Sequence, residues 1–198
     1  AARTFDYTRP ETMAAALDGV EVLALISSSD FEKRVGQHAN VITAAKAAGV
    51  GRVIYTSILK ADQSPLMIAQ DHKATEEILK ASGLSYTMLR NPWYIENWTA
   101  SLPIAVAQGA MIGATGGAMA TPATRQDLGE ALAAVAASKG HDNKVYELGA
   151  DTPFTLHQMA AALSKAVGKT IPYNDLPQEA YAGILASVGV PEGFAAMI

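Results

Sequence analysis

Hydrophobic and polar positions along this chain alternate in blocks that predict strands and helices in turn. Residues 20–26 are nearly all apolar, as expected for a parallel strand covered on both faces, and 52–56 has the pattern of a second buried strand. Further strands are predicted at 85–90 and 144–148. Helices are predicted at 31–48, 66–81, 96–108, 125–138 and 155–167. In the first of these helices the apolar stripe is predicted to consist of Val35, Ala39, Ile42 and Ala45. Because strands and helices alternate with short loops, the sequence predicts an α/β fold with a mainly parallel sheet.

The ends of the chain are predicted from weaker patterns. Residues 3–7 are predicted to form a short strand, and Thr8 with Glu11 a capping box that opens a helix through Leu17. A short strand at 110–112 precedes the glycine-rich segment 113–117, which we expect to be a hairpin or a surface turn. The chain from residue 172 onward is predicted to be a small helical appendage. We therefore expect a main domain at 1–150 and a smaller, dependent portion at 151–198.

Composition excludes several classes of protein. The chain has 198 residues, of which 49% are hydrophobic and 17% charged, which suits one well-buried α/β domain. A net charge of -4 argues against a binder of nucleic acid or anionic membranes, because those partners select clustered Lys and Arg. No apolar run is long enough to predict a membrane span, and the absence of Cys suits a reducing cytoplasm. We expect a cytoplasmic protein without nucleic-acid or membrane partners.

The loop that follows the strand at 85–90 is the strongest candidate for a ligand site. Its sequence is Asn91, Pro92, Trp93, Tyr94, Ile95, Glu96 and Asn97. In open parallel sheets ligands bind outside the carboxyl ends of the strands, and proline with two aromatic side chains makes a stiff wall for a planar ligand. The alternative is a capped strand-to-helix turn whose aromatic side chains lie at an interface. The loop alone does not separate these two readings.

Polar residues also follow two other predicted strands. Ser27 and Ser28 come directly after Leu25 and Ile26, and Thr56 and Ser57 lie at the end of the second buried strand. Hydroxyl groups at such positions suit phosphate or ribose contacts, although Ser equally caps the next helix. Two adjacent polar strand ends favour a shared crevice more than either does alone.

Three further patterns concern chemistry. His72 could donate a proton from the helix at 66–81 or could simply be solvated, and Arg125 could open a helix or reach a ligand. No Tyr has a Lys four residues later, so the acid and ribose-anchor pair of many short-chain dehydrogenases is missing. The four His residues are far apart in the sequence, and no Gly-x-Ser-x-Gly elbow occurs. We therefore expect neither a metal site nor a serine hydrolase.

Taken together, these segments resemble the NmrA-like branch of atypical short-chain dehydrogenases, and within it the bacterial NADPH-dependent quinone oxidoreductases. The matching segments, in order, are 19–29, 40–50, 55–57, 72–76, 86–97, 123–125 and 144–148. The resemblance implies a Rossmann-like doubly wound sheet and NADPH as the cofactor, with NADH left open. It places Leu25 to Ser28 and Pro92 to Asn97 beside the nicotinamide half of that cofactor, with Thr56, Ser57 and Arg125 nearby.

One departure from the family pattern is large. The family begins with a strand, a Gly-x-x-Gly-x-x-Gly turn and a helix, and this chain contains no such turn. The resemblance starts at about the family's third strand, so we expect 22–26 to form an apolar sheet edge open to unintended pairing. The expected consequences are marginal stability, self-association and weak cofactor binding by the 198-residue chain. The C-terminus is also expected to be incomplete.

The resemblance implies direct hydride transfer from NADPH to a quinone or similar carbonyl compound, with His72 and Tyr94 as the candidate catalytic residues and Asn97 as a further hydrogen-bond donor. A small-molecule quinone or carbonyl substrate is the expected partner, and a homodimer is one expected assembly. The alternative is a non-catalytic NADP-sensing regulator, as some NmrA-like proteins are, and the missing Tyr-x-x-x-Lys pair is compatible with it. An epimerase or a reductase of other substrates is a third reading that fold alone leaves open.

Overall fold

The computed structural model describes residues 2–190 and residue 195. The chain divides into two compact units, each of which is formed by two stretches of sequence. Unit 1 comprises Ala1–Pro92 and Gln126–Leu148, and unit 2 comprises Trp93–Arg125 and Gly149–Ile198. The expected division into 1–150 and 151–198 stays a prediction.

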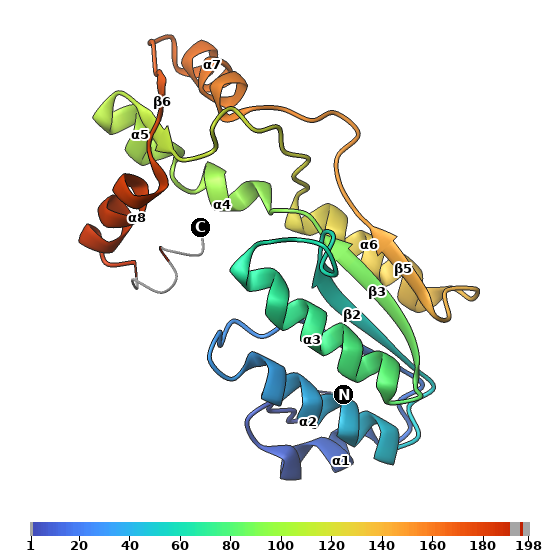
Figure 1. The fold of residues 1–198 in the computed structure, drawn as a ribbon. Helices are drawn as coiled ribbons and strands as arrows, with labels where there is room; N and C mark the ends of the chain where they lie inside the picture. The colour runs from blue at the N-terminus through green and yellow to red at the C-terminus, as the bar shows by residue number, and fades with distance from the viewer. Residues whose placement is uncertain (1, 191–194, 196–198) are drawn as a thin grey trace. The chain divides into compact units, whose positions relative to one another are not determined.

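Unit 1 contains a four-stranded sheet in which every pairing is parallel, in the strand order β1-β2-β3-β5 (Figure 1). The strands are β1 (Val22–Leu25), β2 (Arg52–Ile58), β3 (Ser85–Asn91) and β5 (Lys144–Glu147). β2 and β3 pair over seven residues each and form the centre of the sheet. The predicted α/β fold with a parallel sheet is thereby confirmed.

Helices cover both faces of this sheet. They are the short η1 (Pro10–Thr12), α1 (Met13–Leu17), α2 (Arg34–Ala47), α3 (Met67–Ala81) and α6 (Arg125–Ala137). α2 and α3 lie on one face and α6 on the other (Figure 1). Along β2, Val53 and Tyr55 join the core beneath α2 and α3, whereas Arg52 donates to the carbonyl oxygens of Val135 and Ser138 at the end of α6. This alternation follows from the two-residue period of a strand.

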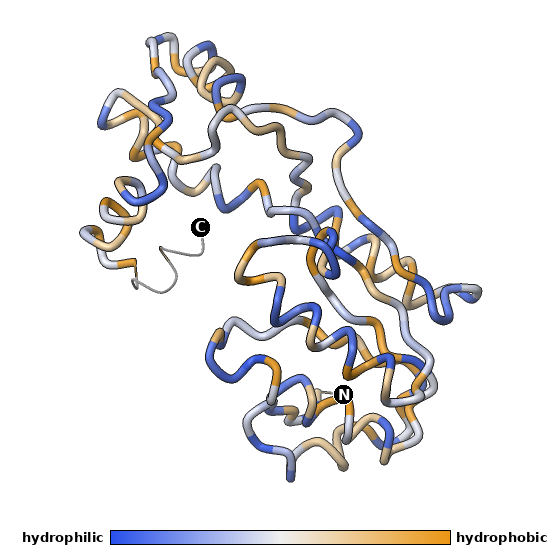
Figure 2. The backbone as a smooth tube through the Cα atoms, in the orientation of Figure 1, coloured by the Kyte–Doolittle hydropathy of each residue, from blue (hydrophilic) through white to orange (hydrophobic). Residues whose placement is uncertain are grey.

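The predicted apolar stripe of α2 is confirmed at Ile42 and Ala45, which are buried, but not in the first half of the helix. Val35 and Ala39 are only half-buried, and the buried places one residue earlier are taken by Arg34 and His38. Both buried side chains are polar but hydrogen-bonded, so the helix can bury them without losing all the interactions they had in water. Figure 2 shows hydrophilic as well as hydrophobic residues along the helices of this unit.

The first predicted elements are wrong in detail. Residues 3–5 form no strand, and Thr8 does not cap a helix but donates its backbone N–H to Asp6 Oδ1. η1 begins after Arg9, and Phe5 packs against the core without strand pairing. Hydrophobic burial rather than a backbone ladder therefore holds this segment.

β1 lies at one edge of the sheet, as the sequence predicted. It pairs with β2 alone among the described strands, and its residues Val22 to Ala24 are half-buried, while Leu25 is fully buried. The expectation of a strand covered on both faces is therefore wrong for most of β1, because a strand with one neighbour shields less of its side chains.

Unit 2 is built around a second, two-stranded parallel sheet. Its strands are β4 (Met111–Gly113) and β6 (Tyr173–Asp175), and its helices are α4 (Ile95–Thr99), α5 (Leu102–Gln108), α7 (Leu156–Val167) and α8 (Gln178–Ser187). The helix predicted at 96–108 is two helices, and Pro103, in the first turn of the second, has no N–H to continue the first. The core of this unit includes Met111, Leu156 and Tyr173.

Two local predictions in unit 2 have different outcomes. The capping box of Thr155 and Gln158 is confirmed at the start of α7. The glycine-rich segment is a turn, but the hairpin alternative is wrong, because β4 pairs in parallel with β6. Asp175 Oδ1 accepts the backbone N–H groups of Thr115 and Gly116 and so holds the turn. The tail predicted as helical contains α8 but begins with β6.

Candidate functional site

In unit 1 the strand ends of β1 and β2 are joined directly. The backbone N–H of Ser27 donates to Thr56 Oγ1 at 2.9 Å. The hydroxyl of Ser28 donates to Gln37 Oε1 at 2.5 Å and accepts the N–H of Asp30. Leu25 belongs to the core, whereas Ile26 is 51% exposed. The structure thus brings the two polar strand ends together. Among residues 25–28, which were predicted to border the cofactor, Ile26 has the most accessible side chain.

His38 holds the Ser28 segment against the two neighbouring helices. Its Nε2 accepts the backbone N–H of Ser28 at 2.9 Å, so Nδ1 carries the ring proton of the neutral imidazole and donates it to Thr75 Oγ1 at 3.0 Å. Thr75 in turn donates to the carbonyl oxygen of Asp71. Burial, with a smaller contribution from the Arg34 charge, lowers the pKa of His38 to about 4. This neutral ring is therefore part of the scaffold beneath the strand ends.

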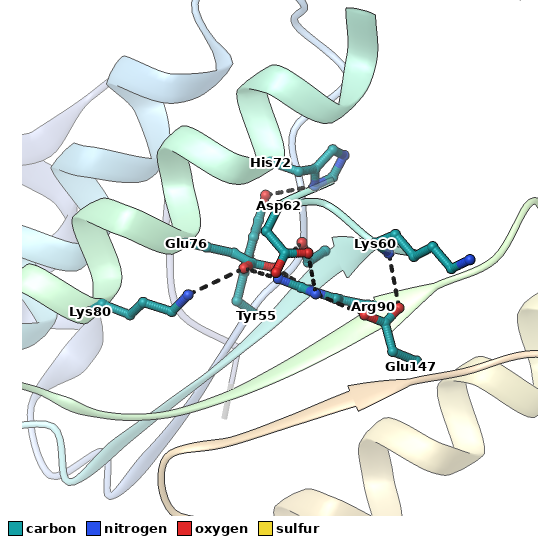
Figure 3. Close-up of polar contacts among 9 residues, drawn as sticks. Tyr55, Lys60, Asp62, His72, Glu76, Lys80, Arg90 and Glu147 are labelled. Carbon is teal, nitrogen blue, oxygen red and sulfur yellow. Dashed lines mark hydrogen bonds and ion pairs between the residues drawn. The ribbon is translucent and has the colours of Figure 1, made fainter. Parts of the chain in front are cut away.

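His72 is not solvated, which removes the simpler of its two sequence readings. The ring is 5% exposed, and its Nδ1 lies 2.8 Å from the hydroxyl of the fully buried Tyr55 (Figure 3). Burial, followed by the charges of Arg34 and His38, lowers the pKa of His72 to about 3. His72 is consequently neutral at physiological pH, and any donor role would use the neutral imidazole.

Arg34 lies close to both histidines and is itself 4% exposed. Its Nε donates to the carbonyl oxygen of Ser28 at 2.6 Å, and its guanidinium lies 4.5 Å from the centre of the Phe31 ring. NH1 is 3.7 Å from Asp71 Oδ2, which is an ion pair but not a hydrogen bond. Burial lowers the pKa of Arg34. The positive field of this side chain helps to keep His38 and His72 uncharged.

Ser57, predicted beside the cofactor, takes part in a network centred on Arg90. Arg90 binds Glu76 with two parallel hydrogen bonds of 2.8 and 2.7 Å, and its NH1 reaches both Asp62 and Glu147. The Ser57 hydroxyl donates to Glu76 Oε1 at 2.7 Å. The bonds to Glu76 raise the pKa of Arg90. This network ties β3 to α3, to β5 and to the loop after β2, which is a structural task.

In unit 2 the predicted loop is held by a short backbone ladder. Tyr94 forms a parallel bridge with Ala123, whose N–H donates to the carbonyl oxygen of Trp93 and whose own carbonyl accepts the N–H of Ile95. Asn97 is exposed within α4. Asn91 and Pro92, the first two residues of the predicted loop, are buried in unit 1 at the end of β3. The backbone of 93–95 is thus fixed, and its side chains are half-buried.

Arg125 is grouped with Tyr94 and Glu96 within unit 2. Its backbone N–H donates to Glu96 Oε1 at 2.8 Å, and its Nε lies 4.0 Å from Glu96 Oε2. Its guanidinium lies 5.9 Å from the centre of the Tyr94 ring, within the range of a cation–π contact. The Arg125 side chain is 62% exposed, so it can reorient toward a ligand at little cost.

Several polar atoms of the predicted loop are buried without a hydrogen-bond partner among the described residues. They are Trp93 Nε1, Glu96 Oε2 and Asn91 Oδ1. A buried polar atom that has lost water and gained no partner costs about 1–3 kcal/mol. Such groups in proteins bind an ordered water, an ion or a ligand, or they mark functional strain. The unpaired atoms therefore favour the ligand-binding reading of this loop over the simple turn.

In the part of the chain that the structure describes, no three His, Cys, Asp or Glu side chains gather as metal ligands would. No helix within residues 2–190 combines the length and hydropathy needed to cross a membrane.

Comparison with known proteins decides the family. The model of the NmrA-like family matches residues 4–198. The chain belongs to the NmrA-like family. This confirms the resemblance seen in the sequence.

Individual relatives within the family are similar over nearly the whole chain. Quinone oxidoreductase 2 of Escherichia coli is 49% identical over 196 residues, which are 99% of this chain and 68% of that protein. The crystal structure of the E. coli NADPH-dependent quinone oxidoreductase in complex with NADPH superposes with a TM-score of 0.95 and covers 98% of this chain and 69% of that one. The Citrobacter triphenylmethane reductase in complex with NADP(H) is 34% identical, with a TM-score of 0.93, and covers 98% and 70%. The chain is thus a homologue of NADPH-dependent reductases.

The sequence reading missed the residues that hold the strand ends in place. The sequence patterns argue against His38 as a metal ligand but give it no other role, and they do not predict the contact of the Tyr55 hydroxyl with His72. One signal was present: His38 precedes Val41 and Ile42 by three and four residues, so a polar ring interrupts an apolar helix stripe. A polar side chain in such a position predicts an internal hydrogen bond.

Proposed function

We propose that this protein reduces quinones or related carbonyl compounds by direct hydride transfer from NADPH. The observation that carries the proposal is the aromatic loop with its unpaired buried atoms, in a chain 49% identical to a quinone oxidoreductase. The similar proteins named above are reductases of quinones and of triphenylmethane dyes, which are both conjugated electron acceptors. A planar conjugated acceptor is accordingly the substrate class that we propose here.

The residues available in this chain fit the nicotinamide half of the cofactor. A nicotinamide carboxamide both donates and accepts hydrogen bonds, and in unit 2 Trp93 Nε1 is an unpaired donor for its oxygen. In unit 1, the Ser27 and Ser28 segment with Thr56 offers hydroxyl and backbone groups for ribose contacts. The glycine-rich phosphate turn of the family is not in this sequence, so the residues described here are assigned no phosphate contact.

Trp93 and Tyr94 are proposed to flank the planar acceptor. Both rings are half-buried, and the ladder with Ala123 fixes the backbone that carries them. A rigid aromatic wall restricts a flat molecule to few orientations, and such positioning accounts for a large share of many rate enhancements. Arg125, over the Tyr94 ring, is proposed to contact the cofactor or the substrate carbonyl.

The chemical requirements of the step define what the side chains must do. NADPH supplies a hydride, the quinone takes up that hydride and one proton, and hydroquinone and oxidised cofactor leave. While the hydride is transferred, one quinone oxygen gains negative charge. A hydrogen-bond donor aimed at that oxygen stabilises the charge, and His72, Tyr94 and Asn97 are the candidate donors. None of them needs to be charged for this role.

The test is oxidation of NADPH with menadione as the quinone, using protein expressed from its complete coding sequence. The wild-type protein is expected to oxidise NADPH only when menadione is present. Trp93→Ala and Tyr94→Ala are each expected to lower turnover at least ~10-fold, as expected when positioning fails. Tyr86→Ala, at the amino end of β3, is the matched aromatic control and should keep the turnover of the folded protein.

Two results would contradict the proposal. Unchanged turnover in Trp93→Ala and Tyr94→Ala would remove the loop from the mechanism. Binding of NADPH by the wild-type protein without menadione-dependent oxidation would instead favour the NADP-sensing regulator.

A further inference from the structure

We propose that Tyr55 is a positioning residue that holds His72 in the tautomer with its proton on Nε2, so that His72 presents a neutral hydrogen-bond donor to the substrate oxygen. This inference rests on the proposed function for the role of His72, but the tautomer itself can be measured without any reaction. The residues concerned, Tyr55 on β2 and His72 on α3, both belong to unit 1.

The tautomer follows from the surroundings of the Tyr55 hydroxyl. The side chain is fully buried, so its hydroxyl proton has no water to bind and needs a protein acceptor. Two side chains face this hydroxyl: His72, whose Nδ1 lies at 2.8 Å, and Thr75. Thr75 Oγ1 is already engaged, because it donates to the carbonyl oxygen of Asp71 and accepts from His38 Nδ1, so His72 Nδ1 is the acceptor left for the Tyr55 proton. Burial also raises the pKa of Tyr55, so the phenol keeps its proton. Tyr55 therefore donates to Nδ1, and the ring proton of a neutral His72 must be on Nε2.

The geometry aims that proton away from Tyr55. In Figure 3 the side of the His72 ring that carries Nδ1 faces the hydroxyl, and the other ring nitrogen points in the opposite direction. The Tyr55 and His72 rings are 5.9 Å apart between centres and inclined by 34°, so the contact also restricts the tilt of the imidazole. A donor held at one nitrogen in one orientation is preorganised for an oxyanion.

The surrounding charges favour the neutral ring. Arg34 and the polar ring of His38 lie on the α2 side, Asp71 and Glu76 lie on α3, and Tyr55 lies on β2. Burial opposes protonation of His72 most strongly, and the positive charge of Arg34 opposes it further. A neutral imidazole that donates a hydrogen bond is an established way to stabilise a developing oxyanion without a charged acid.

A nuclear magnetic resonance measurement tests the tautomer directly on the 198-residue chain. The long-range 1H–15N pattern of ¹⁵N-histidine protein at neutral pH shows which ring nitrogen is protonated, and loss of one pattern in His72→Gln assigns it. The expected result is a proton on Nε2 in the wild type and a mixture of tautomers in Tyr55→Phe. A proton on Nδ1 in the wild type, or the same pattern in Tyr55→Phe, would overturn the proposal.

A pair of amide substitutions tests the role of the donor in menadione reduction. Glutamine places its amide nitrogen near the position of Nε2, whereas asparagine reaches only the position of Nδ1. Both His72→Gln and His72→Asn are expected to lower kcat, with the glutamine variant at least ~10-fold faster than the asparagine variant, as expected for an oxyanion donor. The same pair at the exposed His157 should leave kcat unchanged.

The outcomes separate the inference from the proposed function. Absence of menadione-dependent oxidation in the wild type would contradict the proposed function and the donor role, while the Nε2 tautomer would still be decided by the spectra. An active wild type in which His72→Asn and His72→Gln have equal kcat would contradict the donor role alone.

Discussion

Arg90 and Arg125 show how differently two regions of this chain use the same side chain. Arg90, in unit 1, is 5% exposed and forms short hydrogen bonds with three carboxylates. Arg125, in unit 2, has a side chain that is 62% exposed, lies 4.0 Å from Glu96, and rests over the ring of Tyr94. The first guanidinium has its hydrogen-bonding capacity largely used by the protein. The second retains donors for another molecule.

The same contrast holds for the neighbours of the two arginines. Glu76, the main partner of Arg90, accepts from Arg90 with both oxygens and from the Ser57 hydroxyl. Glu96, the partner of Arg125, keeps Oε2 buried without a hydrogen bond, and Trp93 Nε1 is in the same state. Satisfied polar networks stabilise a fold, whereas unsatisfied buried atoms indicate where a ligand would add hydrogen bonds. Buried polar residues alone therefore do not mark a site, and the unpaired ones are the better guide.

The largest expected effect is on stability, in Arg90→Met. The substitution leaves Glu76 as a buried carboxylate without its main partner, and loss of one member of a buried ion pair costs about 3–5 kcal/mol. We expect the free energy of unfolding in urea to fall by that amount. Arg125→Met is the matched control, and because exposed ion pairs contribute little, it should change stability by less than about 0.5 kcal/mol. Equal losses in the two variants would contradict the comparison.

The next effect is a loss of stability in acid. The folded state lowers the pKa of His38 to about 4 and that of His72 to about 3, whereas an unfolded histidine titrates near 6.5. The unfolded chain therefore binds more protons below pH 6.5, so the stabilisation is complete above that pH and is lost as pH falls toward 4. Together the two rings should cost about 3–4 kcal/mol between pH 7 and pH 5.

Urea unfolding at several pH values measures this loss. His72→Gln removes one of the two titrating rings and should reduce the slope between pH 6.5 and pH 5. His157→Gln, at an exposed position, should leave the slope as in the wild type. An unchanged slope in His72→Gln would mean that His72 is not held neutral by the fold.

The third expected effect is a loss of stability in Gly113→Ala, because Gly113 lies against Tyr173 in unit 2. A Cβ at Gly113 would lie 2.7 Å from the Tyr173 hydroxyl oxygen and 3.3 Å from Leu156 Cδ1. Gly113→Ala is expected to cost about 1–3 kcal/mol of stability, the usual range for an overpacked core. Gly129→Ala, where the added atom meets nothing within 4 Å, is the control and should not destabilise the chain. Equal melting temperatures for the two variants would contradict the packing described for Tyr173.

The smallest effect is expected for binding by Arg125. Arg125→Ala removes a donor that the fold does not need, so we expect the KM for NADPH to rise about 10-fold, the equivalent of about 1.4 kcal/mol. The melting temperature should stay close to that of the wild type. Steady-state kinetics with menadione give the KM. An unchanged KM would show that Arg125 is simply a solvated residue at a helix start.

Much of the fold could be predicted because it depends on local patterns. The strands around β2 and β3 and the capping box at Thr155 follow from composition and spacing. The segment at 3–7 could not be predicted, because Phe5 and Tyr7 have strand-like residue types but are held by packing against the core. Long-range burial outweighs propensity in such a segment.

The site was predictable only in part, for a related reason. The loop at 91–97 and Arg125 stand out in the sequence through rigid aromatics and position after a strand. The hydrogen bonds from Ser57 to Glu76 and from Tyr55 to His72 connect β2 to α3, and no spacing rule gives such pairs. The one related signal is the helical spacing of His38 and His72, which places both rings on the buried faces of their helices and so predicts internal hydrogen bonds.

We propose that the buried indole N–H of Trp93 donates to a ligand, whereas Trp98 packs against the core of unit 2. The chain has two Trp residues, and the half-buried Trp98 packs against the core of unit 2, with its ring centre 6.0 Å from that of Phe154. Their indole N–H signals can be followed by 1H–15N spectra during titration with NADP+ and menadione, in protein expressed from its complete coding sequence, and assigned with Trp93→Phe. We predict that the Trp93 signal shifts with saturation while the Trp98 signal stays in place. A Trp93 signal that does not move at saturating ligand, or equal shifts of both signals, would contradict the account.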